Sequence, residues 1–350
     1  MRECLARLQA HQAGPAALVD LLPGRGLSGI RVGAPAFVGV LGQQVGAQVQ
    51  HVDRVHAQVP VDLGQSKLLC GVVDENYSVQ VNATTSTRGL GRDELLGLLV
   101  QAIRDTGVQP AAIGVSCAAT IDRRSATLVW GGDLPLEGVR LQEVLEDELG
   151  VPVVVENDGN AAAVGEHRAG AGVGVDDLIV LTVGTGVGGG LILGGRLHRG
   201  ATGIAGELGH FAVDARGPRC VDGCPGIGHL DVLGSGSALD AAARRLGLVD
   251  GPELVDRARS GDPSAGRAVA RVGRMLGRGL ASLVNVLDPE LVLVGGGAAA
   301  AGELLLEPMR RIVRRRALPP ARDTVRVEQA GLGERASLVG AGALALEAAA

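Results

Sequence analysis

The stretch Val151-Pro152-Val153-Val154-Val155-Glu156-Asn157-Asp158-Gly159-Asn160 joins an apolar run to a polar segment, and this pattern indicates the class of fold. Its apolar run, Val151–Val155, predicts a short buried strand, and polar residues follow at once. Polar residues at the carboxyl end of a buried strand mark a ligand site in α/β proteins. Asp158 can accept a proton from a substrate hydroxyl that attacks a phosphoryl group, and Asn157 can hold neighbouring hydroxyls. The alternative is an Asx turn that caps a helix starting near Asn160.

Strand and helix patterns alternate on both sides of this stretch. Apolar residues at helical spacing predict helices over 93–106 and 264–287, the second stopped by Asp288-Pro289. A third helix ends at Leu149, where Gly150 suits a helix C-terminus. Short apolar runs predict strands over 113–117, 178–183 and 291–294. The alternation predicts an α/β fold.

Three glycine-containing turns follow predicted strands. Asp62-Leu63-Gly64-Gln65-Ser66-Lys67 predicts a hairpin turn whose backbone N–H groups and hydroxyl suit phosphate oxygens, and Asp62 can hold a metal through water. The stretch 182–190, Thr-Val-Gly-Thr-Gly-Val-Gly-Gly-Gly, lets backbone approach phosphates without a Cβ clash. Gly295-Gly296-Gly297 ends the last predicted strand. Each turn alone is also consistent with a purely structural hairpin.

A cluster of cysteine and histidine residues lies between positions 207 and 231. Two cysteines and two histidines, His210, Cys220, Cys224 and His229, fall within about 20 residues and make a plausible tetrahedral zinc set. Four protein ligands close such a site, so the zinc would be structural. The alternative is two idle thiols and two surface imidazoles.

Composition narrows the class of protein. The chain has 350 residues, 46% of them hydrophobic, which suits two globular domains, and a formal charge of −5 gives no basic stripe for duplex binding. The arginines between 310 and 316 predict a solvated helix face. No apolar run reaches the ~20 residues of a membrane span, and the start of the chain lacks a signal-peptide core. Five cysteines without a disulfide framework favour a reduced cytoplasm.

Taken together, the order of these motifs resembles the ROK family (repressors, open reading frames, kinases), whose kinases include bacterial glucokinases. The resemblance runs from about Val61 to Leu346. It implies a two-domain actin-like (ribonuclease H-like) ATPase fold with a cleft between domains. It also implies an ATP-dependent hexose kinase, with Mg²⁺ and structural Zn²⁺ as cofactors, a hexose or amino sugar as substrate, and a cytoplasmic homodimer.

The resemblance implies a role for each matching residue. Asp158 is the implied catalytic base. The implied sugar-binding residues are Asn157, Glu207, His210 and Asp231. The implied nucleotide-binding residues are Asp62, Gly64, Ser66, Lys67, Gly184, Thr185, Gly186, Gly295, Gly296 and Gly297. The implied zinc ligands are His210, Cys220, Cys224 and His229.

Several positions depart from the family pattern. Gln65 and Ser66 replace Gly and Thr in the first turn, so Gln65 adds a side chain where phosphate approaches. His229 stands where the last zinc cysteine belongs, and histidine is an acceptable ligand. Asp231 replaces a glutamate and is one methylene shorter, which affects the sugar accepted. Ser116-Cys117-Ala118-Ala119 replaces a proline-glycine turn.

The expected domains are a leader over 1–60, a smaller α/β domain over 61–155 with 332–350, and a larger one over 156–331 with the zinc loop. Many family members are sugar-responsive repressors with a helix-turn-helix where residues 1–60 stand. Gly26-Leu27-Ser28 is similar to the turn of such a motif, but Pro23 would break the preceding helix and no basic recognition helix follows. The sequence therefore favours a kinase over a repressor. A sugar-binding regulator without catalysis is a third interpretation, and either ATP or polyphosphate can be the donor.

Overall fold

The computed structural model describes residues 57–132, 134–220 and 224–350, which belong to one compact unit, His51–Ala350. The expected leader over 1–60, with its possible DNA-binding turn, therefore lies almost wholly outside the described residues. Within them, no helix combines the length and apolar character that crossing a membrane requires.

The first half of the described chain builds a mixed five-stranded sheet in the order β3-β2-β1-β4-β7. Its strands are β1 Val59–Leu63, β2 Lys67–Val73, β3 Val79–Ser86, β4 Ile113–Cys117 and β7 Val153–Asn157. Strands β1, β4 and β7 run parallel to one another. Strand β2 pairs antiparallel with β1, and β3 pairs antiparallel with β2. Helices α2 (Arg92–Arg104) and α3 (Leu141–Leu149) bury their leucines in this sheet's core. A small hairpin, β5 (Thr120–Asp122) with β6 (Thr127–Trp130), follows β4.

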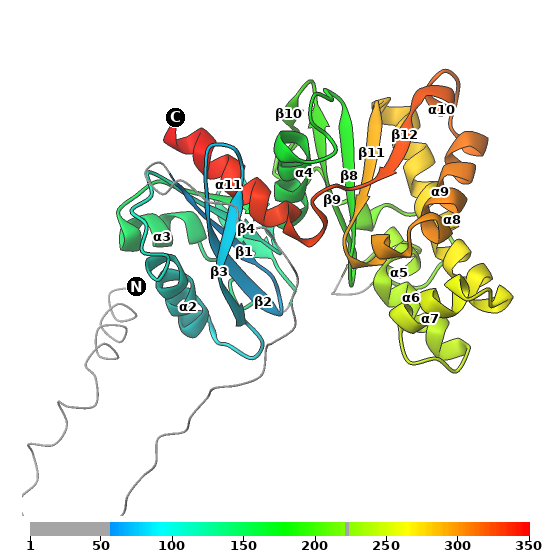
Figure 1. The fold of residues 1–350 in the computed structure, drawn as a ribbon, viewed down its shortest axis with the longest axis horizontal. Helices are drawn as coiled ribbons and strands as arrows, with labels where there is room; N and C mark the ends of the chain where they lie inside the picture. Colours follow the sequence, from blue (N-terminus) through cyan, green and yellow to red (C-terminus); the bar gives the residue numbers. More distant parts are fainter. Residues whose placement is uncertain (1–56, 133, 221–223) are drawn as a thin grey trace, which may run out of the picture. The chain divides into compact units, whose positions relative to one another are not determined.

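The second half builds another five-stranded sheet, in the order β10-β9-β8-β11-β12 (Figure 1). Its strands are β8 Leu178–Val183, β9 Val187–Leu193, β10 Arg196–Leu197, β11 Leu291–Gly295 and β12 Arg326–Gln329. The helices here are α5 Leu230–Gly234, α6 Gly236–Arg245, α7 Gly251–Arg259, α8 Pro263–Leu287, α9 Glu303–Arg316 and α10 Ala321–Thr324. Three short 3₁₀ helices are η1 Leu208–His210, η2 Gly297–Ala301 and η3 Gly333–Arg335. Each sheet has its own large apolar cluster made almost wholly of aliphatic residues, and the second sheet also has a smaller one that includes Leu178, Val180 and Leu293.

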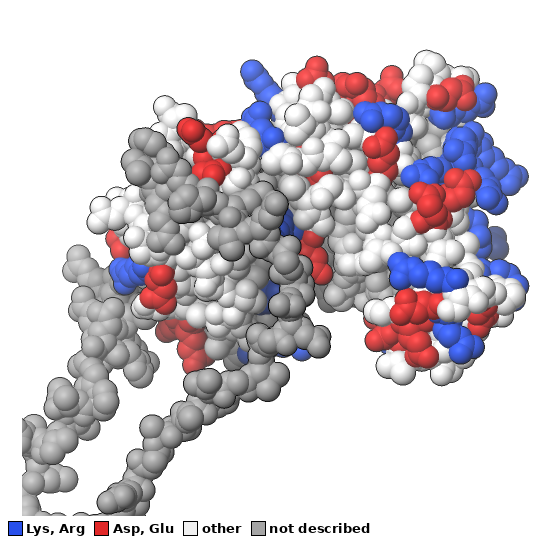
Figure 2. Space-filling model, in the orientation of Figure 1, with Lys and Arg blue, Asp and Glu red and all other residues white. Residues whose placement is uncertain are grey.

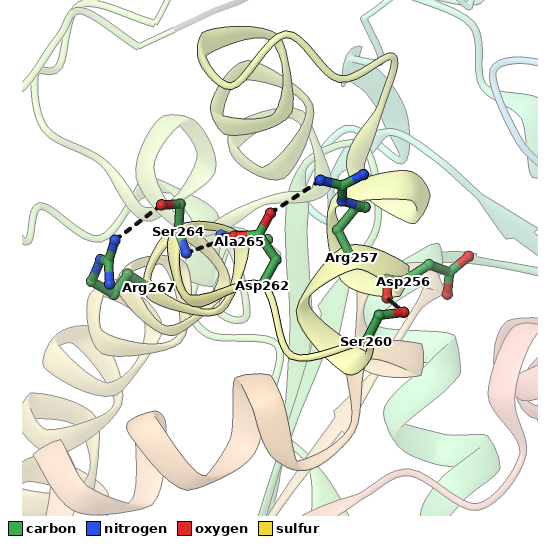
Figure 3. Close-up of polar contacts among 7 residues, drawn as sticks. All are labelled: Asp256, Arg257, Ser260, Asp262, Ser264, Ala265 and Arg267. Atoms are coloured by element: carbon green, nitrogen blue, oxygen red, sulfur yellow. Dashed lines mark hydrogen bonds and ion pairs between the residues drawn. The ribbon is translucent and has the colours of Figure 1, made fainter.

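Helix α8 shows how local sequence sets an element boundary. Asp262 caps its N-terminus by accepting hydrogen bonds from the backbone N–H of Ser264 (2.8 Å) and Ala265 (3.2 Å), while Arg257 pairs with the other carboxylate oxygen (Figure 3). These hydrogen bonds hold the pKa of Asp262 below its ordinary value. Pro263 occupies the first helical position, where its missing N–H costs nothing. The helix expected over 264–287 is thus confirmed.

Helices α4 (Asp158–Ala169) and α11 (Ala336–Ala349) pack closely against each other. Helix α11 also contacts β1 and β4 of the first sheet, whereas α4 contacts β8 and β9 of the second. Small residues permit this approach: a Cβ at Gly340 would lie 1.7 Å from the carbonyl oxygen of Ala161. The helix pair therefore joins the two halves through backbone contact.

The arginines of α9 lie on an exposed face, as expected. Figure 2 shows Lys and Arg side chains gathered on the side where Figure 1 draws α9 and α10. Arg310 pairs with Glu303, and Arg311 and Arg314 pair with Glu307. Intrahelical acids thus balance part of the positive charge.

Candidate active site

The carboxyl ends of the parallel strands meet at one edge of the first sheet. Register places Asp62 of β1 beside Ser116 of β4, and Ser116 beside Glu156 of β7. The Ser116 hydroxyl donates to Asp62 Oδ1 at 2.8 Å. Strand β7 extends two residues further than expected, so Glu156 and Asn157 lie in the strand and Asp158 begins α4. The carboxylates of Asp62 and Asp158 are thereby brought to the same edge.

Asp158 is a partly buried acid whose pKa is strongly raised. Burial, helped by the charges of Asp62 and Glu207, raises its pKa to about 7 against the opposing hydrogen bond from Gly159. That bond, from the Gly159 N–H to Oδ1, measures 2.8 Å, and Asn157 Nδ2 donates to the same oxygen at 3.2 Å. A carboxyl with a pKa near neutrality is suited to act as a general base.

Asn157 serves as the N-cap of α4, with its Oδ1 accepting from the Asn160 N–H at 3.1 Å. The expected alternative, a cap on this helix, is therefore also present, although the helix begins at Asp158. Asn157 therefore caps the helix through Oδ1 while its Nδ2 contacts the Asp158 carboxylate.

A cavity of about 670 Å³ opens beside Asp158. Of the expected nucleotide-binding residues, it is lined by Lys67, Gly184, Thr185, Gly296 and Gly297. Gly184 and Gly297 have open space where a Cβ would lie, so phosphates can approach their backbone. Asp62, Gly64, Ser66, Gly186 and Gly295 are not among the lining residues. The volume falls within the range of small-molecule sites.

The first glycine turn differs from expectation in the course of Gln65. Its Nε2 atom lies 2.4 Å from the place that a Cβ on Gly132 would occupy. The side chain thus lies against Gly132 and is not among the cavity-lining residues. Lys67 of the same turn pairs with Glu334 across the cavity lining, at 3.4 Å.

Sequence reasoning missed one wall of this cavity, which comes from α6 and α7. Its lining residues there are Gly236, Leu239, Asp240, Gly251, Pro252, Val255, Asp256 and Arg259. The start of α6 is fixed to the second glycine turn, because Gly236 N donates to Gly184 O and Ser237 Oγ donates to Thr185 O, both at 2.8 Å. The Ser235 N-cap was the available signal, although a cap alone does not indicate a cavity wall.

The expected sugar-binding residues form a second group near Asp158. Glu207 accepts a hydrogen bond from Thr120 at 2.9 Å and is close enough to raise the pKa of Asp158. Asp231 lies in the first turn of α5 and accepts from the Val187 N–H at 2.8 Å. Its carboxylate lies 3.5 Å from the place that a Cβ on Gly209 would occupy. Asp231 therefore neighbours both the second glycine turn and the Glu207–His210 segment.

The four expected zinc ligands come together. One ligand atom from each of His210, Cys220, Cys224 and His229 lies within 4.8 Å of all the others. The isolated bridges Ala212–His229 and Arg219–Ile227 fold this loop back on itself. The ring of Trp130 packs on His210, with ring centroids 4.9 Å apart.

The donor set fits a tetrahedral zinc ion. Zinc bonds of about 2.0–2.3 Å place neighbouring nitrogen and sulfur ligands about 3.3–3.8 Å apart. The two histidine Nδ1 atoms are 3.4 Å apart, Cys220 Sγ is 3.7 Å from His210, and Cys224 Sγ is 3.6 Å from His229. The spacing and the chemistry of the donors both suit the ion.

Comparison with known proteins agrees with this geometry. The family profile described as the ROK family matches residues 58–348. A glucokinase of Streptomyces coelicolor is 35% identical over 314 residues, covering 83% of this chain and 97% of that enzyme. A xylose repressor of Caldicellulosiruptor bescii is 30% identical over 275 residues, covering 72% of this chain and 68% of the repressor.

A solved relative is the ROK family glucokinase of Streptomyces griseus in complex with glucose and AMPPNP. It is 35% identical, with a TM-score of 0.74 over 83% of this chain and 99% of that chain. The expected two-domain actin-like ATPase fold is confirmed by this likeness.

Proposed function

The chain belongs to the ROK family, and from this premise we propose that it is an ATP-dependent sugar kinase. The observation that carries the proposal is Asp158, a partly buried acid with a pKa raised to about 7 that lines the cavity beside two glycine turns. Its substrate is a hexose or amino sugar, as the glucose in the Streptomyces griseus relative suggests.

In the proposed reaction, Asp158 takes the proton of a sugar hydroxyl as its oxygen attacks the γ-phosphorus of ATP. The new bond joins the sugar oxygen to phosphorus, the bond from phosphorus to the β-phosphate bridge oxygen breaks, and ADP leaves. Asn157, Glu207, His210 and Asp231 hold the sugar hydroxyls. Positioning and exclusion of water supply most of the catalysis, since water would otherwise compete as acceptor.

The nucleotide is proposed to occupy the 670 Å³ cavity, whose wall includes Lys67, Gly184, Thr185, Gly296 and Gly297 of the three glycine turns. Gly64, Ser66 and Lys67 serve the first turn, Gly184, Thr185 and Gly186 the second, and Gly295, Gly296 and Gly297 the adenosine side. Asp62 fits Mg²⁺ held through water, because it is a buried carboxylate whose pKa burial raises and which a cation would stabilise. The ion would neutralise phosphate charge.

Further proposals follow from the family resemblance. Zn²⁺ on His210, Cys220, Cys224 and His229 closes the loop next to Glu207, which supports a structural role. Residues 61–155 with 332–350 are the proposed smaller domain and 156–331 the larger, although the first sheet also includes residues 59–60 and 156–157. A cytoplasmic location agrees with the free thiols. A homodimer is the expected assembly, which light scattering can test.

The test is a panel of hexoses and amino sugars with ATP and Mg²⁺, read by coupled ADP detection. A kinase releases ADP in step with one or a few sugars, and polyphosphate in place of ATP separates the two donors. Absence of turnover on every common sugar, in protein shown to be folded, would overturn the proposal.

A sugar-responsive regulator is the second candidate, favoured by the identity to the xylose repressor. The kinase is preferred because the chain covers 97% of the glucokinase but only 68% of the repressor. A regulator predicts salt-sensitive duplex binding that sugar relieves and that deletion of residues 1–60 abolishes.

A further inference from the structure

The described chain passes between the two sheets twice. It leaves β7 through α4 to reach β8, and it returns from β12 through residues 330–335 into α11. We call residues 330–335 the return segment. Glu166, in the last turns of α4, has a relative exposure of 0%.

Glu166 binds both passages at once. Its Oε1 accepts from the Leu332 N–H at 2.7 Å, and its Oε2 accepts from the Gly331 N–H at 3.0 Å. The same Oε2 accepts from the Ala171 N–H, also at 3.0 Å, where the chain leaves α4. One buried carboxylate thus satisfies three backbone donors, two of them 165 and 166 residues away in sequence.

The return segment carries part of the cavity wall. Gly333 and Glu334 line the same cavity as Asp158, as do Ala336 and Ser337 just beyond the segment. Ser337 also forms a side-chain hydrogen bond with Asp62. The helix that begins with Asp158 is therefore tied, near its other end, to a segment that lines the same cavity as Asp158.

We propose that Glu166 is a positioning residue for phosphoryl transfer, which rests on the proposed kinase function. It holds the return segment on α4, so that Glu334 and Ser337 keep their places in the nucleotide cavity. If the Glu166 carboxylate is removed, the Gly331 and Leu332 N–H groups lose their acceptor. The site is tightly packed, because a Cβ at Gly331 would lie 3.1 Å from Ala171 N. Unpaired buried donors are costly, so the segment would shift or open.

The test uses Glu166→Gln in the full-length protein. A carboxamide offers one acceptor oxygen instead of two, so at least one of the three amides loses its partner. We expect the nucleotide KM to rise about tenfold while the sugar KM changes less than about twofold. Amide exchange at Gly331 and Leu332, measured without substrates, should accelerate by at least about tenfold.

Glu146→Gln is the matched control. Glu146 also accepts a backbone bond, from the Val153 N–H at 3.0 Å, but within the first half of the chain. We expect it to leave the nucleotide KM and the exchange of the return segment unchanged. If Glu166→Gln does not fold, Glu166→Asp is measured in the same way, with a smaller effect in the same direction expected.

Unchanged exchange at Gly331 and Leu332 in a folded Glu166 variant overturns the inference, whatever the turnover. A lower melting temperature with both KM values unchanged also overturns it. So does failure of both Glu166 variants to fold when Glu146→Gln folds. Either result makes Glu166 a merely structural residue. A wild-type protein without turnover instead refutes the kinase function, and the exchange measurement tells the two failures apart.

Discussion

The charge of Asp62 raises the pKa of Asp158, although Asp62 lies in β1 and Asp158 follows β7, two strands that are not neighbours in the sheet. The relationship follows from topology, because β4 lies between β1 and β7 with all three parallel. Two acids at one edge, both with raised pKa values, constitute a site that is costly to fold and useful for proton transfer.

The pH dependence of turnover should reflect this pair. Asp158 must be ionised to act as a base, so kcat/KM should fall about tenfold per pH unit below its pKa of about 7. Replacing Asp62 by Asn removes a charge that raises this pKa, so the acidic limb should move to lower pH. Asp122→Asn, at an exposed site, is the control. An unmoved limb in the Asp62 variant would contradict the coupling.

Asp158 should also limit stability above neutral pH. Its pKa is 3.8 ordinarily and about 7 in the folded protein, so folding favours the protonated form. Its contribution is fully present below about pH 4 and is lost as the pH rises through 7. Asp158→Asn should therefore raise the free energy of unfolding at pH 8, with an upper limit on the order of 4 kcal/mol, and change it little at pH 4. Urea unfolding at the two pH values measures this, and equal effects at both would refute it.

Local sequence predicted much of this arrangement. Helix α3 with its Gly150 cap, strand β4 and strand β8 have the expected bounds, because apolar spacing and glycine signal them locally. The meeting of His210, Cys220, Cys224 and His229 was also predicted. The cavity wall from α6 and α7 was not predicted, and neither were the hydrogen bonds from the return segment to Glu166. Both depend on contacts between segments that are distant in the sequence. Strand β7 lies two residues further along the chain than expected because its pairing with β4 covers residues 153–157.

Removing the cysteines of the metal cluster should release the metal. A Cys220→Ser, Cys224→Ser variant should contain no zinc by metal analysis and lose at least about 2 kcal/mol of unfolding free energy. Trp130, the chain's single tryptophan, packs on His210, so its emission should change as well. Cys70→Ser, at a thiol outside the cluster, should retain the metal. Full zinc occupancy in the double variant would refute this ligand set.

The crossing of α4 and α11 should not tolerate a methyl group. Gly340→Ala would place Cβ 1.7 Å from the Ala161 carbonyl oxygen, so we expect a loss of about 1–3 kcal/mol of unfolding free energy. Gly266→Ala in α8 meets nothing within 4 Å and should gain up to about 1 kcal/mol from helix propensity. Urea unfolding of both variants tests the contrast. Equal stability changes would show that the crossing adapts.

The turnover of Asp158→Asn with the preferred sugar, ATP and Mg²⁺ tests whether Asp158 is the catalytic base. An amide keeps the shape of the side chain but cannot accept the proton. We expect the kcat of this variant to fall by a factor of about 10²–10⁴ and its nucleotide KM to stay nearly unchanged. A variant that turns over as fast as the wild type would contradict it.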